Sequence, residues 1–380
     1  MTQAENEGGF GTNAGPAGTG VASRRGMTLP TKWLTAGLGA AVGIAFSAAV
    51  VPAQAQGAVS FTGWGGVTQD AVLNNLFAGA DKLGITIKAD RSGAWPGIKA
   101  HLLSGAPGWD LTEVGFARCE QASQANTLLP IDYGIVDKSV LPAQLALPNY
   151  VALYTFSYGI TYQKKKYGDN GPKSWADFYD VKKFPGRRSM IGEGLYAFES
   201  ALIADGVPPQ DVYKVLKAPG GVDRAFKKLA EIKPHVAVWW RSTGQAMQAV
   251  HDGEVDMAIF PNGRAMALVN DGVDIAFEWN QAFIDTECLM LPKNAANPKG
   301  AFQLINLSLD PKNQARFAAA IGYGPVNLKA YDTGILTPAQ MAWLPTAPAN
   351  IDKQVYADQT WYASREAEEA YIRFSKFLQE

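Results

Sequence analysis

Short apolar segments with strand character alternate with amphipathic segments from residue 59 onward, and this alternation constrains the fold more than any other feature. In the first part of the chain, strands are predicted at 59–64, 85–89 and 109–115, and helices at 69–83 and 96–103. Alternation at this spacing is typical of βαβ units, in which helices connect parallel strands. The sequence therefore predicts an α/β fold of mainly parallel sheets flanked by helices.

A second block of the same kind follows an aromatic, apolar run at 150–162, which is predicted to be a buried strand. The further strands are predicted at 186–191, 236–240, 255–260 and 288–291, and the further helices at 175–178, 198–205, 222–232, 243–251, 298–309 and 312–322. Two α/β blocks with several crossings predict two lobes that face each other across a cleft. Such a cleft is a natural place for a small ligand.

The first 55 residues have the anatomy of a bacterial export signal. Arg24, Arg25 and Lys32 precede an uncharged Ala/Gly-rich run at 33–51, and Pro-Ala-Gln-Ala follows at 52–55. A basic region, an apolar region and a small-x-small site predict cleavage after Ala55 and a periplasmic location for the rest. The alternative is an uncleaved membrane anchor, since the run is nearly long enough to span a bilayer. The export route, general or twin-arginine, and the start at Met1 or Met27 stay open.

Charge and composition narrow the function classes. The leader holds 3 of the 34 basic and 2 of the 35 acidic residues, so the remainder carries 31 and 33 and has a formal charge of −2. Without a basic stripe there is no electrostatic footprint for nucleic acid. The 10 Trp favour recognition of a ligand by ring stacking or cation–π contacts, although most of them are expected in the core.

The two cysteines, Cys119 and Cys288, lie far apart in the sequence. Two separate buried thiols are the expected arrangement. A disulfide is the alternative, because an exported protein meets an oxidising compartment.

The sequence contains no catalytic or cofactor-binding motif that supports an enzyme. His101, His235 and His251 are isolated, and H-E-x-x-H, C-x-x-C and G-x-S-x-G do not occur, so no metal site and no cofactor are expected. The Gly-x-Gly-x-x-Ala at 192–197 only superficially matches a dinucleotide fingerprint, since Glu193 would place negative charge at the phosphates. The preferred interpretation is a flexible turn that directs Glu193 toward a cleft.

Aromatic and acidic residues stand where loops leave the predicted strands. They are Trp64, Glu193, Asp285 and Tyr323. Loop positions beside strand ends often contact ligands, and carboxylates flanked by aromatic faces suit an organic cation. Taken alone, each residue is more often structural, with Trp64 in the core and Glu193 and Asp285 as solvated or hinge carboxylates. Arg264 is interpreted first as an internal ion-pair partner and second as a contact for an anionic ligand.

At these residues the chain resembles the solute-binding proteins of bacterial ABC importers, in the spermidine/putrescine-binding branch. The segments that carry the resemblance are 61–64, 174–177 with Pro185-Gly186, 252–257, 261–264, Asp285 before Leu291-Pro292, and 321–327. The resemblance extends from Phe61 to about Tyr362. It implies a type II periplasmic-binding-protein fold with a ligand cleft at the hinge.

The resemblance also implies roles for individual residues. Trp64 and Tyr323 would be aromatic walls, Asp285 would hold an ammonium group, and Glu193 falls on one of two acids of the second lobe. The second of these acids falls at or near Tyr196 and is missing. The remaining candidate ligand contacts are Phe116, Trp240, Asn262, Phe283 and Trp361, of which Phe283 and Trp361 stand where the polyamine branch has other residues.

The sequence thus predicts a monomeric, non-enzymatic binding protein that captures a small cationic solute, such as putrescine or spermidine, for a membrane permease. One alternative is the same transporter class with an anionic or zwitterionic metabolite, such as an amino acid or opine. Another is an exported acid/base hydrolase. The expected lobes are 56–157 with 286–330, and 158–285 with 331–380, and hinges are expected near 157–161 and 285–287.

Overall fold

The computed structural model describes residues 57–91, 93–106 and 108–380. The predicted signal segment and its cleavage site lie outside these residues. In the described ranges, no helix is long and apolar enough to cross a membrane.

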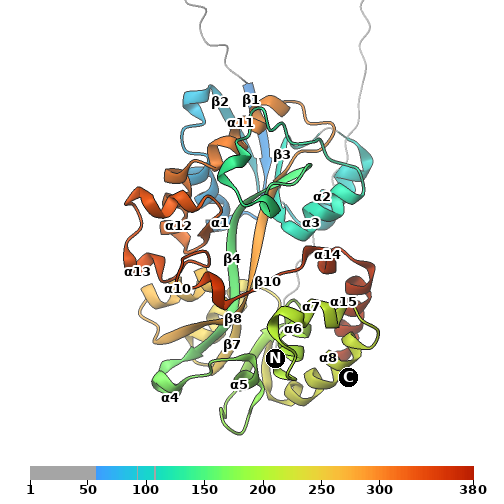
Figure 1. Cartoon of the computed structure of the whole chain (residues 1–380), viewed down its shortest axis with the longest axis vertical. Helices are drawn as coiled ribbons and strands as arrows, with labels where there is room; N and C mark the ends of the chain where they lie inside the picture. Colours follow the sequence, from blue (N-terminus) through green and yellow to red (C-terminus); the bar gives the residue numbers. More distant parts are fainter. Residues whose placement is uncertain (1–56, 92, 107) are drawn as a thin grey trace, which may run out of the picture. The chain divides into compact units, whose positions relative to one another are not determined.

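The strands and helices follow the predicted alternation (Figure 1). The strands are β1 Gly57–Thr62, β2 Ile85–Asp90, β3 Leu111–Gly115, β4 Tyr150–Gln163, β5 Arg188–Ile191, β6 Val236–Trp240, β7 Met257–Pro261, β8 Ile275–Met290, β9 Gly324–Pro325 and β10 Val355–Tyr356. The α-helices are α1 Gly66–Ala71, α2 Trp95–Ser104, α3 Phe116–Gln124, α4 Lys164–Tyr167, α5 Trp175–Tyr179, α6 Ala197–Ala204, α7 Val212–Leu216, α8 Gly221–Ile232, α9 Thr243–His251, α10 Asn262–Asn270, α11 Pro298–Ser308, α12 Pro311–Ile321, α13 Pro338–Met341, α14 Gln359–Tyr362 and α15 Arg365–Phe377.

The main sheet has the order β2-β1-β3-β8-β4-β7-β5-β6, with β10 beside β8 and β9 beside β4. Strands β1, β2 and β3 are parallel at one end, and β5, β6 and β7 are parallel at the other. The long strands β4 and β8 pair antiparallel and run through the middle of the molecule, where they connect the two parallel groups (Figure 1). This is the two-lobe periplasmic-binding-protein fold, in which each lobe is a mainly parallel sheet flanked by helices.

Two hydrophobic cores divide along these central strands. The first contains residues of β4 up to Tyr154 and of β8 from Cys288 onward, together with β1 and β3. The second contains β4 from Ile160 and β8 up to Phe283, together with α6 and α8. A small third cluster joins 330–347 to α12. We keep the predicted lobe boundaries as a proposal, with the addition that 330–347 packs beside the first lobe.

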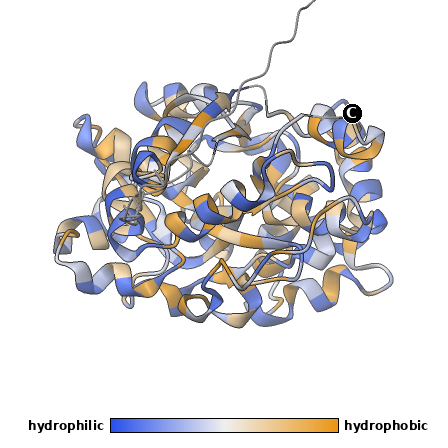
Figure 2. Ribbon diagram, turned by 90° about the horizontal axis from the view of Figure 1, so that it is seen from above, coloured by the Kyte–Doolittle hydropathy of each residue, from blue (hydrophilic) through white to orange (hydrophobic). Residues whose placement is uncertain are grey.

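Hydrophilic and hydrophobic residues alternate along many of the helix ribbons in Figure 2. In α8, Ala225, Phe226, Leu229 and Ile232 are buried, whereas Asp223, Arg224 and Lys227 are exposed. Intervals of one and three residues place these apolar side chains on one face of a helix with 3.6 residues per turn, which is the pattern of an amphipathic helix.

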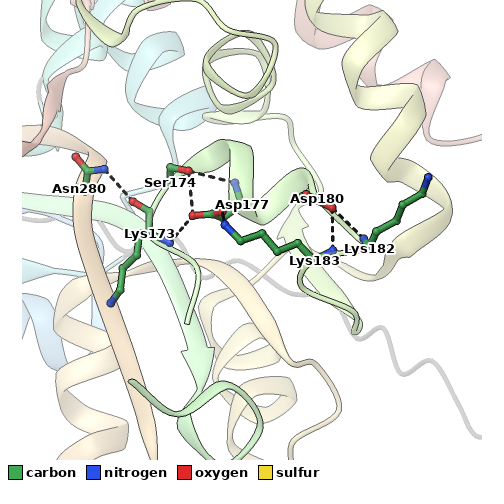
Figure 3. Close-up of polar contacts among 7 residues, drawn as sticks. All are labelled: Lys173, Ser174, Asp177, Asp180, Lys182, Lys183 and Asn280. Carbon is green, nitrogen blue, oxygen red and sulfur yellow. Dashed lines mark hydrogen bonds and ion pairs between the residues drawn. The ribbon is translucent and has the colours of Figure 1, made fainter. Parts of the chain in front are cut away.

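Helix α5 begins where local hydrogen bonds fix it (Figure 3). The Ser174 hydroxyl accepts from the Asp177 backbone N–H at 3.2 Å, an N-cap, and the Asp177 carboxylate accepts from the Lys173 N–H at 3.0 Å. The Asn280 side chain donates to the Lys173 carbonyl at 2.8 Å and ties the cap to β8. These bonds place Trp175 against the second core.

The two cysteines form a disulfide, so the expectation of separate thiols is wrong. Cys119 on α3 and Cys288 on β8 are joined, with Cα atoms 6.6 Å apart. The fold brings together positions that are 169 residues apart because α3 packs directly on β8. The bond fastens a helix of the first lobe to a central strand.

Candidate functional site

A cavity of about 860 Å³ lies between the two lobes, and we call it the central cleft. Its walls come from both cores and its floor from the central strands. The lining residues are Trp64, Trp95, Pro96, Lys99, Gly115, Phe116, Ala117, Arg118, Gln121, Phe156, Tyr158, Gly192, Glu193, Leu195, Arg241, Asp285, Glu287, Tyr362, Glu368, Tyr371, Ile372 and Ser375. A cavity of this size accommodates a small organic molecule.

Four of the predicted residues meet in the central cleft. Trp64 follows β1 and is 48% exposed, and Phe116 begins α3. Glu193 is exposed on the turn after β5, and Asp285 lies on β8. The structure therefore brings together one aromatic pair and one acidic pair from four separate elements. Their part in ligand binding stays a proposal.

Three other predicted residues do not line the cleft, because their rings are used in the second core. Phe283 is fully buried and stacks between Trp175 and Tyr196, with ring centroids 5.2 and 5.0 Å away. Trp361 is fully buried in α14. Trp240 lies behind the cleft-lining Tyr158, and its ring stacks on that tyrosine at 6.4 Å.

Asn262 and Tyr323 also lie outside the cleft lining. The Asn262 amide accepts from the Ser157 N–H at 2.8 Å and donates to the carbonyls of Gly322 and Trp343 at 2.6 and 2.8 Å. It therefore ties the expected hinge to two distant segments. Tyr323 is only 9% exposed and packs behind Phe156, so it supports the wall from below.

The position of Arg264 agrees with neither of the two roles predicted from the sequence. It does not line the cleft and has no ion-pair partner among the described residues. Its guanidinium donates instead to the Thr68 hydroxyl at 3.1 Å, which connects α10 with α1. The contact joins a helix of the second core region to one of the first.

Asp285 is held firmly by neutral donors. One oxygen accepts from the Tyr196 hydroxyl at 2.7 Å, and the other accepts from the Thr286 N–H at 2.7 Å and the Gln359 amide at 3.0 Å. Burial raises the pKa of Asp285, although these donors oppose the rise. The Tyr196 hydroxyl thus acts as a hydrogen-bond donor to this acid.

Sequence reasoning missed the acid Glu287, which is buried in the floor of the cleft. It lies two residues after Asp285 on β8, and residues two apart on a strand point to the same face. The Asp-Thr-Glu spacing was the signal that could have found it. The Trp64 indole N–H donates to its carboxylate, while its Oε2 atom has no partner within the described residues.

Glu113 lies beside Glu287 under the same floor. It accepts from the Tyr154 hydroxyl at 2.6 Å, and its other oxygen has no partner in the described part of the chain. Burial raises the pKa of Glu113 to about 7. Burial and the nearby Glu113 carboxylate likewise raise the pKa of Glu287 well above its ordinary value. The described residues hold no cluster of three or more ligands arranged for a metal ion.

Basic groups line the walls of the same cleft. They are Lys99, Arg118 and Arg241. The Arg118 guanidinium donates to Gln121 at 3.1 Å and lies over the Trp95 ring at 5.5 Å. Arg241 is exposed, and its guanidinium has no partner among the described residues. The central cleft therefore has an unpartnered carboxylate oxygen of Glu287 buried in its floor and a free guanidinium on its wall.

A further buried acid, Glu199, supports the wall beneath Tyr362, whose hydroxyl donates to it. Burial raises the pKa of Glu199 from 4.5 to about 7. A group with a raised pKa binds its proton more tightly in the folded state, so its contribution to stability is complete below pH 4.5 and is lost as pH rises through about 7. Glu113, whose pKa burial also raises to about 7, likewise loses its contribution to stability as pH rises over this range.

We therefore expect the thermal midpoint to fall as pH is raised from about 4.5 to about 8. The carboxylates whose pKa is lowered, such as Asp110 and Asp256, act only below their ordinary value of 3.8. Glu199→Gln mimics the protonated side chain and should flatten this decline, whereas Glu254→Gln, at an exposed turn, should not. Melting curves across this range check the prediction, and a midpoint that rises over the window contradicts it.

Comparison with known proteins agrees with this architecture. A family model described as "Bacterial extracellular solute-binding protein" matches residues 77–349. The chain is 32% identical to the "Gamma-aminobutyric acid-binding protein" of Pseudomonas aeruginosa, over 88% of this chain and 94% of that protein. The "Spermidine/putrescine-binding periplasmic protein" of Escherichia coli matches at 27% identity over 41% of this chain and 43% of its own length.

Solved structures extend the likeness to the whole described fold. An ABC transporter substrate-binding protein from Bradyrhizobium japonicum is 38% identical, with a TM-score of 0.79, covering 84% of this chain and 99% of that chain. The PBP MotA from A. tumefaciens B6, in complex with glucopine, is 36% identical with a TM-score of 0.76, covering 83% and 99%.

Proposed function

Because the chain belongs to the bacterial extracellular solute-binding protein family, as the substrate-binding component of an ABC transporter, we propose that it captures a small zwitterionic solute. Such proteins bind a small molecule and deliver it to a membrane permease. The proposed solute carries an ammonium group and a carboxylate, as 4-aminobutyrate does. We further propose that the protein works as a monomer in the periplasm after cleavage near Ala55.

The observation that carries this proposal is the pairing of opposite charges in the central cleft. Asp285 and Glu287 offer carboxylates to an ammonium group, and the Arg241 guanidinium offers a fork of donors to a carboxylate. The aromatic rings of Trp64 and Phe116 would cover the methylene groups between them. A solute with both charges uses both sets of groups.

A polyamine, the first prediction from the sequence, fits less well. In the polyamine branch a second acid of this lobe falls at or near Tyr196, whereas here the Tyr196 hydroxyl donates to Asp285. The free guanidinium of Arg241 would repel a second ammonium group. The relative named for 4-aminobutyrate also matches twice as much of this chain as the polyamine-binding relative does. The zwitterionic alternative is therefore preferred.

Closure of the lobes would complete the site. The two cores separate on β4 between Tyr154 and Ile160 and on β8 between Phe283 and Cys288. The β4–β8 register also shifts between Tyr158 and Ile160. We place the hinges in these segments, where few residues need to change backbone angles for the lobes to close.

Calorimetric titration with three probes tests the proposed solute class. The expected result is saturable binding of 4-aminobutyrate and much weaker binding of putrescine and succinate at equal ionic strength. Tight binding of putrescine alone would restore the polyamine assignment. Tight binding of succinate alone would favour an anionic solute.

Arg241→Ala should weaken 4-aminobutyrate binding about 10- to 100-fold, because a charged hydrogen bond contributes about 1.5–3 kcal/mol. The same change should leave putrescine binding unchanged or improved. Arg365→Ala removes an exposed arginine outside the cleft and serves as the matched control. An Arg241 variant that binds 4-aminobutyrate as tightly as the unaltered protein contradicts the carboxylate contact.

A further inference from the structure

Three carboxylates share the sheet face that forms the floor of the central cleft. In the strand registers, Gly115 and Tyr154 are opposite Glu287, and Phe156 is opposite Asp285. Glu113 lies two residues before Gly115 on β3. Because residues two apart and directly paired residues point to one side of a sheet, Glu113, Asp285 and Glu287 lie on the same face.

These three acids differ in which of their carboxylate oxygens still lack a hydrogen-bond partner. Asp285 accepts three hydrogen bonds from neutral donors. Glu113 has one free oxygen, but that oxygen lies against Gly63, where an added Cβ would approach it to 2.5 Å. Glu287 is 6% exposed, lines the cavity and has a buried Oε2 with no partner in the described residues. It is the acid that both lines the cleft and has an oxygen without a hydrogen-bond partner.

The other groups that face Glu287 do not neutralise it. Trp64 donates one hydrogen bond from the loop after β1. The titratable groups around it are Glu113 on β3, Tyr154 and Tyr158 on β4, Asp285 on β8, and Tyr323 before β9. The positive charge of Arg264 opposes the rise in the pKa of Tyr158 and Tyr323. It is not among the groups that shift the pKa of Glu287. Among the described residues, no cation pairs with Glu287 or Glu113.

We propose that Glu287 is the residue that receives the ammonium group of the solute, and that the Glu113–Glu287 pair releases a proton to solvent as it does so. The inference rests on the proposed function, since it requires an amino solute. Two buried carboxylates without a cation retain a proton between them, because burial and mutual repulsion disfavour two negative charges. An ammonium group supplies the missing cation. Its positive charge stabilises the pair with both carboxylates ionised, so the proton is no longer retained.

The exchange balances in charge and atoms. The free pair carries one proton shared by two carboxylates. The incoming ammonium donates hydrogen bonds to Glu287 Oε2, the carboxylic proton leaves to buffer, and the solute keeps its own three protons. Raised pKa values of both acids, to about 7 for Glu113, support a pair that is still protonated near neutral pH.

The proposal also predicts a preference among amines. A primary ammonium donates hydrogen bonds to the unpartnered Oε2, whereas a trimethylammonium group has no hydrogen to donate. The trimethyl analogue of 4-aminobutyrate should therefore bind at least about tenfold more weakly, although aromatic rings in the cleft attract either cation.

The test is calorimetric titration of the full mature protein with 4-aminobutyrate in buffers of different ionisation enthalpy, from pH 6 to 8. The unaltered protein should release up to one proton on binding, and its affinity should rise with pH by up to about tenfold per unit. Glu287→Gln should lose about 10- to 100-fold in affinity and release no proton. Glu254→Gln, which alters an exposed glutamate outside the cleft, should do neither.

Each outcome decides one question. If 4-aminobutyrate and related amino solutes do not bind the unaltered protein at all, the proposed function fails first. If they bind without proton release, or if Glu287→Gln binds them as tightly, the proposed function stands and the inference is overturned. The proton measurement needs no variant, so it remains decisive even if Glu287→Gln were to fold poorly.

Discussion

Phe283→Ala is expected to lower the free energy of unfolding by about 3–5 kcal/mol, the usual cost of removing a fully buried aromatic ring. Phe283 has no exposed surface and lies between the rings of Trp175 and Tyr196. Its removal leaves a cavity that two large rigid rings cannot fill by small movements. Denaturant unfolding checks the change.

Binding should weaken in the same variant for an indirect reason. Tyr196 packs on Phe283 and donates to Asp285, so loss of the stack loosens the acid in the cleft floor. Phe277→Ala, at a partly buried position on the same strand, is the matched control and should cost less than half as much. If Phe283→Ala proved as stable as the unaltered protein but lost its ligand, the sequence-based role of Phe283 as a ligand wall would be restored.

Much of the fold was predictable because its signals are local. The alternation of strands and helices, and the buried strand at 150–162, follow from short-range periodicity. The full length of β8 was not predictable in this way. Asn280 is exposed and Gln281 adopts a left-handed backbone conformation, so a polar interruption hides a strand that continues from Ile275 to Met290. β4 pairs with β8 on both sides of an irregularity at 279–282, and this pairing holds the two halves in one strand.

The site was predictable only in part, for a related reason. Residues at strand ends, such as Trp64 and Glu193, do reach the cleft. A motif does not show which aromatic residue faces the cavity and which packs one layer behind it, as Tyr323 does behind Phe156. Glu287 was overlooked because a glutamate within an apolar strand is ordinarily a weak signal. Its importance appears only when the registers place Glu113 beside it.

Loss of the Cys119–Cys288 disulfide is expected to lower the free energy of unfolding by about 2–5 kcal/mol, because the bond closes a very long loop in the unfolded chain. Both sulfurs are fully buried, so Cys→Ala at both positions is preferable to serine, which would bury a hydroxyl. Denaturant unfolding of the double variant, and of the unaltered protein with a reductant, measures the loss.

Solute affinity should respond far less than stability to the same change. Cys288 follows Glu287 on β8, and adjacent residues of a strand point to opposite faces, so the disulfide lies on the side of the sheet away from the floor of the central cleft. Affinity for 4-aminobutyrate at 25 °C should therefore change less than about threefold in the double variant. A loss of affinity as large as that of Arg241→Ala would show instead that the disulfide holds α3, with Phe116 and Arg118, in the position that binding requires.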